Sequence, residues 1–234
     1  GRILDVKTGK RTIKSPLPFT TSTLQQEANK TLGFATAKTM RIAQQLYEGV
    51  EIKGEGTVAF ISYLRTDSTR VSDEAKAMAE KYISAKYGKE YCIEEGKEKK
   101  EEKRIQDAHE AIRPTDIERT PESVKNILSR DQYRLYQLIW KRFTASRMAA
   151  SIFETVAVRI KGNEYVFRVS ASKVAFDGYR SVYASDEDEK AENNALLNSV
   201  TKDTKVKFEK FDSEQHFTQP PAHFTESSLV RAME

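Results

Sequence analysis

The sequence TVAFISYLRTDS occupies residues 57–68 and places a tyrosine two positions before an arginine. The apolar run from Thr57 to Ile61 predicts a short buried strand, and residues i and i+2 on a strand share one face. Tyr63 and Arg65 are therefore expected to point the same way. A phenol is a weak nucleophile at neutral pH because its unperturbed pKa is about 10, and a nearby cation favours the phenolate. A guanidinium also binds phosphate oxygens, so the pair suits attack on a phosphodiester, whereas the alternative is a half-exposed strand face without chemistry.

Three further blocks accompany this pair: PFTTSTLQQEA at residues 18–28, DAHEAIRPT at residues 107–115 and QPPAHFTESSLV at residues 219–230. In this order the four blocks resemble the bacterial type IA DNA topoisomerases, over nearly the whole chain from about residue 16 to residue 234. The resemblance implies that Tyr63 is the nucleophile, which forms a covalent 5′-phosphotyrosine link to one DNA strand. It also implies that Arg65 holds the scissile phosphate and that His109 forms a hydrogen bond to the same phosphate.

The family resemblance implies an α+β fold, in which a helical, winged-helix-like cleavage domain is inserted in a β-rich arch. Residues 1–20 and 151–218 are expected to form the two parts of the arch. Residues 21–150 are expected to form the cleavage domain, and residues 219–234 to begin a following helical gate domain.

Local sequence patterns agree with this division. Helical spacing and capping residues predict these helices: Thr21–Gly33 with Ser22 or Thr23 as N-cap, Thr36–Tyr47 closed by Gly49, Asp73–Tyr87 capped by Ser72, one starting at Thr120–Pro121, Asp131–Ala150, and one after Thr225. Alternating apolar residues predict β structure over these segments: Arg2–Lys14 as a ribbon with a Thr-Gly turn, Ser151–Val169 with a hairpin turn at Gly162–Asn163, Val174–Tyr183 and Lys205–Phe211. Residues 94–104, of mixed charge, predict a solvated loop, and residues 191–200 remain ambiguous.

Other residues near the tyrosine have two interpretations each. Ser62 and Thr66 either donate hydroxyl groups to neighbouring DNA phosphates or satisfy local backbone groups. Arg113 either holds its own motif together or contacts the DNA backbone. Residues 20–28 either bind an anion at a helix start or only cap that helix.

No metal site is expected within the chain. A zinc-protease helix with His109–Glu110 would carry its second histidine at position 113, which is Arg113, and the other two histidines lie in distant segments. The sequence also contains no Gly-rich phosphate loop, and its acidic run Asp186-Glu187-Asp188-Glu189 lies in a polar, loop-like stretch and is not expected to form a metal-binding Asp-x-Asp cluster. In the family, Mg²⁺ is bound by a separate acidic Toprim domain, so the chain is expected to be an internal fragment of a larger enzyme.

The resulting functional hypothesis is a fragment of a Mg²⁺-dependent enzyme that relaxes negatively supercoiled DNA through transient single-strand cleavage, strand passage and religation. The fragment alone is expected to be inactive, and the alternative is a module that only binds single-stranded DNA. A tyrosine recombinase or type IB topoisomerase would group arginines and histidines around a late tyrosine. Tyr63 instead precedes His109, and the block at residues 18–28 does not fit that class.

Composition sets further limits. With 38% apolar and 32% charged residues, the chain suits a soluble protein with a core, and no apolar run approaches the ~20 residues that span a bilayer. The 39 basic residues are nearly balanced by 35 acidic ones, so any DNA site must be a local patch. A single cysteine, Cys92, excludes an internal disulfide and suits a reducing compartment. We therefore expect a cytoplasmic, nucleoid-associated monomer whose partner is DNA, chiefly single-stranded segments.

Overall fold

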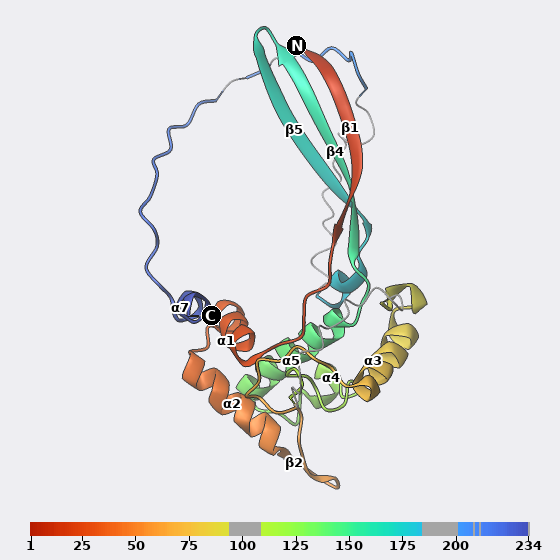
Figure 1. The fold of residues 1–234 in the computed structure, drawn as a ribbon, viewed down its shortest axis with the longest axis vertical. Helices are drawn as coiled ribbons and strands as arrows, with labels where there is room; N and C mark the ends of the chain where they lie inside the picture. The colour runs from red at the N-terminus through yellow and green to blue at the C-terminus, as the bar shows by residue number, and fades with distance from the viewer. Residues whose placement is uncertain (94–108, 184–200, 208, 211, 234) are drawn as a thin grey trace. The chain divides into compact units, whose positions relative to one another are not determined.

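The structure, a computed structural model, describes residues 1–93, 109–183, 201–207, 209–210 and 212–233. The expected loop at residues 94–104 and the ambiguous segment at residues 191–200 lie outside these described residues. The chain forms two compact units (Figure 1). We call them the strand unit, Gly1–Lys14 with Ala150–Ala222, and the helical unit, Ser15–Ala149 with His223–Glu234. The assignment of these units as arch and cleavage domain stays a prediction.

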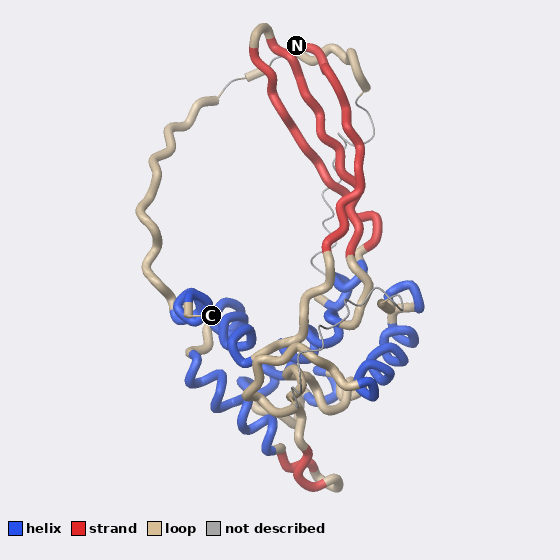
Figure 2. The backbone as a smooth tube through the Cα atoms, viewed as in Figure 1, coloured by secondary structure: helices blue, strands red, loops and turns tan. Residues whose placement is uncertain are grey.

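The strand unit is built on one antiparallel three-stranded sheet in the order β1-β4-β5. Its strands are β1 (Arg2–Ile13), β4 (Ser151–Gly162) and β5 (Tyr165–Phe176), drawn as long red segments in Figure 2. The predicted hairpin is confirmed, because Gly162 pairs with Tyr165 and the backbone reverses at Asn163, whose φ is 55°. Asparagine adopts this left-handed conformation more readily than most residues, which suits it to the turn.

The core of this sheet lies on one face. The register places Ile3 opposite Ile160 and Val6 opposite Val158, so the apolar side chains of β1 and β4 meet on the same side. A small buried cluster results, which contains Ile3, Val156 and Val158 with partly buried Val6, Ile160 and Val206 against it.

Two predictions about β structure are wrong in detail. The Thr-Gly pair at residues 8–9 forms no turn, because both residues pair with β4 and β1 runs through them as one strand. The segment Val174–Tyr183 is β structure only as far as Phe176, and Gly178–Val182 form a 3-10 helix, η2. In the predicted segment Lys205–Phe211, the described residues contain one isolated bridge, between Lys205 and Arg2, while residues 208 and 211 lie outside the description.

The helical unit contains most of the helical structure. Its elements are α1 (Thr21–Leu32), α2 (Thr36–Glu48), the short hairpin β2 (Val50–Ile52) and β3 (Gly56–Val58), α3 (Asp73–Lys86), the 3-10 helix η1 (Lys89–Tyr91), α4 (Pro121–Val124), α5 (Arg130–Ser146) and α7 (Glu226–Ala232). The α+β class is confirmed. None of the helices that the structure describes is long and apolar enough to cross a membrane.

Capping residues explain most helix boundaries. Ser72 caps α3 and Gly33 and Gly49 close α1 and α2, as predicted. The predicted N-cap of α1, Ser22 or Thr23, is wrong by two or three residues: Thr20 occupies it, and its side chain accepts the Thr23 N–H while the Thr23 side chain accepts the Thr20 N–H in return. This reciprocal capping box satisfies two backbone donors at the start of the helix.

Helix α5 supplies the centre of the helical unit's core. Its inward-facing residues are buried: Leu135, Tyr136, Ile139, Trp140 and Phe143. The two polar aromatic groups have partners, since Tyr136 Oη donates to Arg119 O at 2.6 Å and Trp140 Nε1 donates to Ile117 O at 2.9 Å. These aromatic residues therefore belong to the core of the helical unit.

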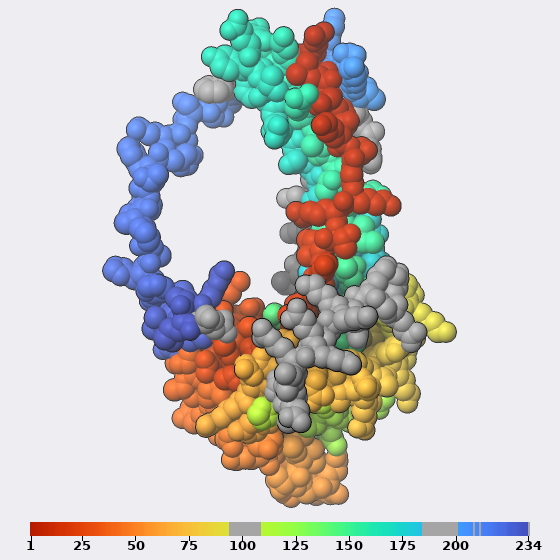
Figure 3. Space-filling model, viewed as in Figure 1, coloured from red at the N-terminus to blue at the C-terminus, as the bar shows by residue number. Residues whose placement is uncertain are grey.

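The C-terminal helix α7 packs against α1, and Figure 3 shows its dark blue atoms against the orange-red atoms of that helix. Glu226 at its start accepts a hydrogen bond from Thr36 N at 2.7 Å, at the N-terminus of α2. The N-cap of α2 is Ala35, which has no side chain for this purpose, so a residue 190 positions away provides the acceptor. The assignment of residues 219–234 to a separate gate domain stays a prediction.

Replacing Glu226 by alanine is expected to lower the free energy of unfolding of the helical unit by about 1 kcal/mol, because α2 loses both a cap and a favourable charge at its N-terminus. Fluorescence of Trp140, the single tryptophan, follows this unit during urea unfolding. Glu118→Ala, at another exposed glutamate, is the control. Equal effects of the two substitutions would show that the Glu226–Thr36 hydrogen bond contributes nothing.

Candidate functional site

The chain around Tyr63 is extended without belonging to a strand. The predicted strand over Thr57–Ile61 is wrong beyond Val58, where β3 ends, although Ile61 forms an isolated bridge with Pro114. Alternation of side chains continues nevertheless: Leu64, Thr66 and Ser68 are buried, whereas Tyr63, Arg65 and Asp67 are exposed. Tyr63 and Arg65 thus both face outward, because an extended backbone turns successive side chains to opposite sides even without strand partners.

Three neighbouring segments replace the missing strand partners. Phe60 N donates to Leu46 O in the last turn of α2 at 2.8 Å, and Ser62 N donates to Arg113 O at 2.9 Å. On the other side of Tyr63, Thr66 O accepts the Thr21 N–H at 2.9 Å. The segment is therefore held at both ends, with Leu64 anchored between them at 1% exposure.

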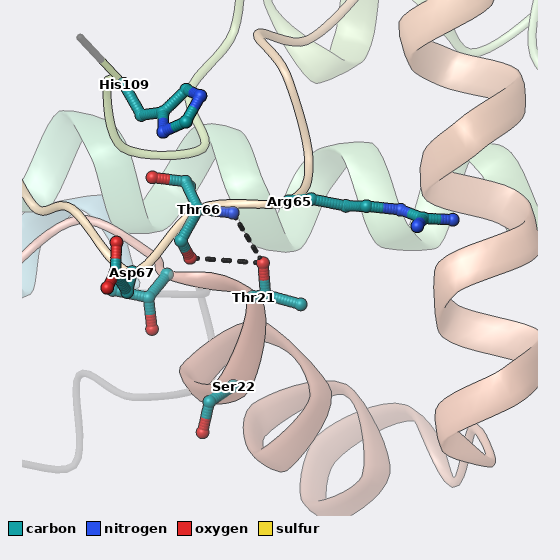
Figure 4. Close-up of a pocket in the computed structure, with 7 residues that line it drawn as sticks. Thr21, Ser22, Arg65, Thr66, Asp67 and His109 are labelled. Carbon is teal, nitrogen blue, oxygen red and sulfur yellow. Dashed lines mark hydrogen bonds between the residues drawn. The ribbon is translucent and has the colours of Figure 1, made fainter. Parts of the chain in front are cut away.

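Thr21 has a structural role in this bracing. Its hydroxyl donates to Leu64 O at 2.7 Å and accepts the Thr66 N–H at 2.8 Å, and Figure 4 shows it beside the Thr66 backbone. The first turn of α1 consequently fixes the backbone on both sides of Arg65. For the block at residues 20–28, this geometry supports the capping and framing interpretation.

Ser62 and Thr66 also bond locally. The Ser62 hydroxyl donates to Ala111 O at 2.8 Å and accepts the Arg113 N–H at 3.0 Å. Thr66 is buried, and its hydroxyl accepts the Ser68 N–H at 3.0 Å. Of the two interpretations offered for these residues, the structure shows backbone satisfaction, and their contact with DNA stays a prediction.

Arg113 is enclosed by its own motif. Its guanidinium pairs with Glu110 at 2.8 Å and donates to Pro114 O at 3.1 Å, and both partners of the ion pair are mostly buried, with side-chain exposures of 17% and 20%. Burial opposes ionisation of Glu110, but the hydrogen bond and charge of Arg113 outweigh it, so the pKa of Glu110 lies below its usual value. The contacts of Arg113 hold the motif together, while the predicted DNA contact stays a prediction.

Tyr63 is 43% exposed, and two other rings lie close to it. Tyr47 meets it edge to face with ring centroids 5.4 Å apart, and His109 lies with its centroid at 6.1 Å. Burial raises the pKa of Tyr82 to about 12 and also raises that of Tyr136, so these two phenols are ill suited to form a phenolate. The structure thus brings together the predicted nucleophile and one predicted phosphate donor.

Next to this cluster lies an open pocket of about 510 Å³, lined by Thr20, Thr21, Ser22, Arg65, Thr66, Asp67 and His109. It joins three of the residues predicted to act on DNA, Arg65, Thr66 and His109, whereas Tyr63, Ser62 and Arg113 are not among its lining residues. Figure 4 shows that the side chain of Arg65 extends away from His109. Within the described part of the chain, no acidic side chain pairs with Arg65.

The described residues contain no group of three or more His, Cys, Asp or Glu side chains that could hold a metal ion. Asp67 and His109 are the metal-ligand types among the pocket residues, and they alone do not form the oxygen-rich shell that Mg²⁺ prefers. These residues do not fit a Mg²⁺ site, and we derive no step through that ion.

Sequence reasoning missed two residues of the site. Tyr47 was assigned only to the end of a helix, and Thr21 only to a helix start. An available signal for Tyr47 is its place two residues before a helix-closing glycine, near the apolar run that leads to Tyr63. Contact between residues 16 positions apart, however, depends on how the intervening hairpin folds.

Comparison with known proteins identifies the family of the chain. The family model described as DNA topoisomerase matches residues 1–234. The chain is also similar to full-length topoisomerase I from Thermotoga maritima, with 40% sequence identity and a TM-score of 0.78 over 99% of this chain. The chain spans 37% of the length of that solved structure. The chain therefore belongs to the bacterial type IA DNA topoisomerases.

Proposed function

We propose that this chain is the tyrosine-bearing part of an enzyme that relaxes negatively supercoiled DNA by cutting, passing and rejoining one strand. The observation that carries this proposal is the exposed Tyr63 on a braced, extended segment, with Arg65 beside it and His109 against its ring. Membership of the topoisomerase family supports the same conclusion.

The proposed reaction is a transesterification. Tyr63 Oη attacks the phosphorus of a DNA phosphodiester, the bond to the 3′-oxygen breaks, and a 5′-phosphotyrosine forms. The phenol loses a proton and the departing 3′-oxygen gains one. In the reverse step the 3′-hydroxyl attacks the phosphotyrosine, so the energy of the original bond is retained and the strand is rejoined.

Arg65 and His109 are proposed to act on the same phosphate. Negative charge grows on the non-bridging oxygens as phosphorus becomes five-coordinate, and donors placed in advance stabilise it. Arg65 is exposed and joins His109 in lining the pocket, although the two side chains diverge. A phosphate bound between them would bring both donors to one group.

Mg²⁺ is proposed to be bound by carboxylates of a Toprim domain, as the family resemblance implies, and not by the residues described above. The ion would supply charge stabilisation at the DNA phosphates. We further propose a monomer that works in the cytoplasm at the nucleoid, on single-stranded segments of supercoiled DNA. If the chain alone binds such DNA without cutting it, it acts by itself as a binding module.

In the intact enzyme, Tyr63→Phe is expected to abolish the covalent protein–DNA adduct, because phenylalanine lacks the attacking oxygen, while DNA binding changes little. Labelled single-stranded DNA is incubated with the enzyme and separated under denaturing conditions. Tyr165→Phe, at another exposed tyrosine, is the matched control and should form the adduct normally. An adduct with the Tyr63 variant that survives denaturant would exclude Tyr63 as the nucleophile.

Two arginine substitutions separate chemistry from bracing. Arg65→Ala in the intact enzyme is expected to slow cleavage by on the order of 10²–10³ without changing stability, as for the loss of one oxyanion donor.

Arg113→Ala is expected to lower the free energy of unfolding by about 1–3 kcal/mol, because it leaves the mostly buried Glu110 without its partner. Rates come from single-turnover cleavage and stabilities from Trp140 fluorescence in urea. The assigned roles are wrong if Arg65→Ala lowers stability at a normal cleavage rate while Arg113→Ala slows cleavage at normal stability.

The 234-residue chain alone is expected not to relax supercoiled plasmid when Mg²⁺ is supplied, because the proton transfers and the metal site are assigned to the Toprim domain. Weak binding to single-stranded DNA is expected, with an affinity that falls as salt rises. Gel analysis of the plasmid tests relaxation, with the intact enzyme as positive control. Efficient relaxation by the chain would overturn this assignment of the metal chemistry.

A further inference from the structure

The ring of Tyr63 is close to two other rings, which come from different parts of the helical unit. Tyr47, 37% exposed, belongs to the last turn of α2 and presents its ring at 67° to that of Tyr63. His109 lies on the segment before Ala111 and is inclined by 34°. In an edge-to-face pair the positive ring edge meets the negative ring face, which favours one relative orientation.

Backbone contacts fix the position of Tyr47 relative to Tyr63. The carbonyl of Leu46, directly before Tyr47, accepts the Phe60 N–H at 2.8 Å. Two residues after Tyr47, Gly49 turns with φ of 107°, and a Cβ atom there would lie 2.8–3.0 Å from Thr57 and Val58. Only glycine permits this close approach, so the end of α2 is held against the strand that leads to Tyr63.

The position of His109 is fixed separately. Ala111 N donates to Arg70 O at 2.8 Å, and the Ser62 hydroxyl bridges Ala111 and Arg113. The two rings beside Tyr63 are therefore placed by independent sets of hydrogen bonds, one through α2 and one through the segment that contains Arg113.

We propose that Tyr47 is a positioning residue for the tyrosine nucleophile, a role that rests on the proposed function of Tyr63. An exposed side chain changes rotamer within picoseconds to nanoseconds, but transfer of a phosphoryl group needs the attacking oxygen in line with the leaving oxygen. The edge of the Tyr47 ring limits the orientations of the Tyr63 ring and holds its oxygen outward, toward bound DNA. This role requires the aromatic ring of Tyr47 and not its hydroxyl.

The test uses the intact enzyme and single-turnover cleavage of a labelled single-stranded oligonucleotide. Tyr47→Phe is expected to cleave at nearly the normal rate, since it keeps the ring. Tyr47→Leu is expected to slow both cleavage and rejoining by on the order of tenfold, as expected for a misplaced reactive group and a lost aromatic pair. Tyr165→Leu removes an exposed aromatic ring in the strand unit and is the control, with no change expected.

A second measurement separates positioning from direct binding of a DNA base. In the Tyr63→Phe background, which cannot form the covalent bond, Tyr47→Leu should leave the dissociation constant for the same oligonucleotide unchanged. A weaker affinity that accounts for the whole rate loss would assign Tyr47 to base stacking and overturn the proposal. A normal cleavage rate for Tyr47→Leu would overturn it as well.

Folding of every variant is checked by fluorescence in the 234-residue chain, in which Trp140 is the single tryptophan. If Tyr47→Leu does not fold, Tyr47→Met replaces it, since methionine keeps a long apolar side chain without a rigid ring. A cleavage rate of Tyr47→Met equal to that of Tyr47→Phe would then refute the role of the ring. Failure of this inference is distinguishable from failure of the proposed function. Adduct formation by Tyr63→Phe would refute the nucleophile itself, whereas wild-type rates in the Tyr47 variants would refute only the positioning role.

Discussion

The site depends on one constraint: the extended segment around Tyr63 must have its backbone hydrogen-bonding groups satisfied without the help of a sheet. A buried backbone group without a partner costs about 1–3 kcal/mol, so such a segment persists only where other elements supply donors and acceptors. Here Leu46, Thr21 and Arg113 provide them, from the end of one helix, the start of another and a loop. Because these partners come from three places in the chain, the tyrosine is placed only where these three segments come together.

The same arrangement explains why polar residues near the tyrosine divide into two groups. Those that face inward, such as Ser62 and Arg113, use their hydrogen bonds on the surrounding backbone and on Glu110. Those that face outward, Tyr63 and Arg65, are exposed; Arg65 lines the open pocket, and Tyr63 lies close to His109, which lines it as well. A rigid inner layer thus supports an outer layer available to a substrate, which is the organisation that precise phosphoryl chemistry requires.

Much of the local structure could be predicted from the sequence. Ser72, Gly33 and Gly49 marked helix ends because capping and left-handed backbone depend on the residue itself, and Gly162–Asn163 marked the hairpin for the same reason. Predictions failed where pairing overrode a local signal. The Thr-Gly pair at residues 8–9 reads as a turn, yet pairing along the whole of β4 keeps it extended. Glu226 gave no sign that it caps a helix 190 residues away.

By itself the sequence determined the family, through the order of the four motifs. It also determined the alternation that turns Tyr63 and Arg65 outward, because this alternation follows from the spacing of the two residues. Only the tertiary structure decided which polar residues spend their hydrogen bonds on the protein backbone. A serine or an arginine can bind a backbone carbonyl or a phosphate equally well, so its partner is known only when its neighbours are known. It also decided that Tyr47 lies against Tyr63. That contact depends on the close approach at Gly49 and on the folding of the β2–β3 hairpin, and such distances in space are not encoded in local spacing.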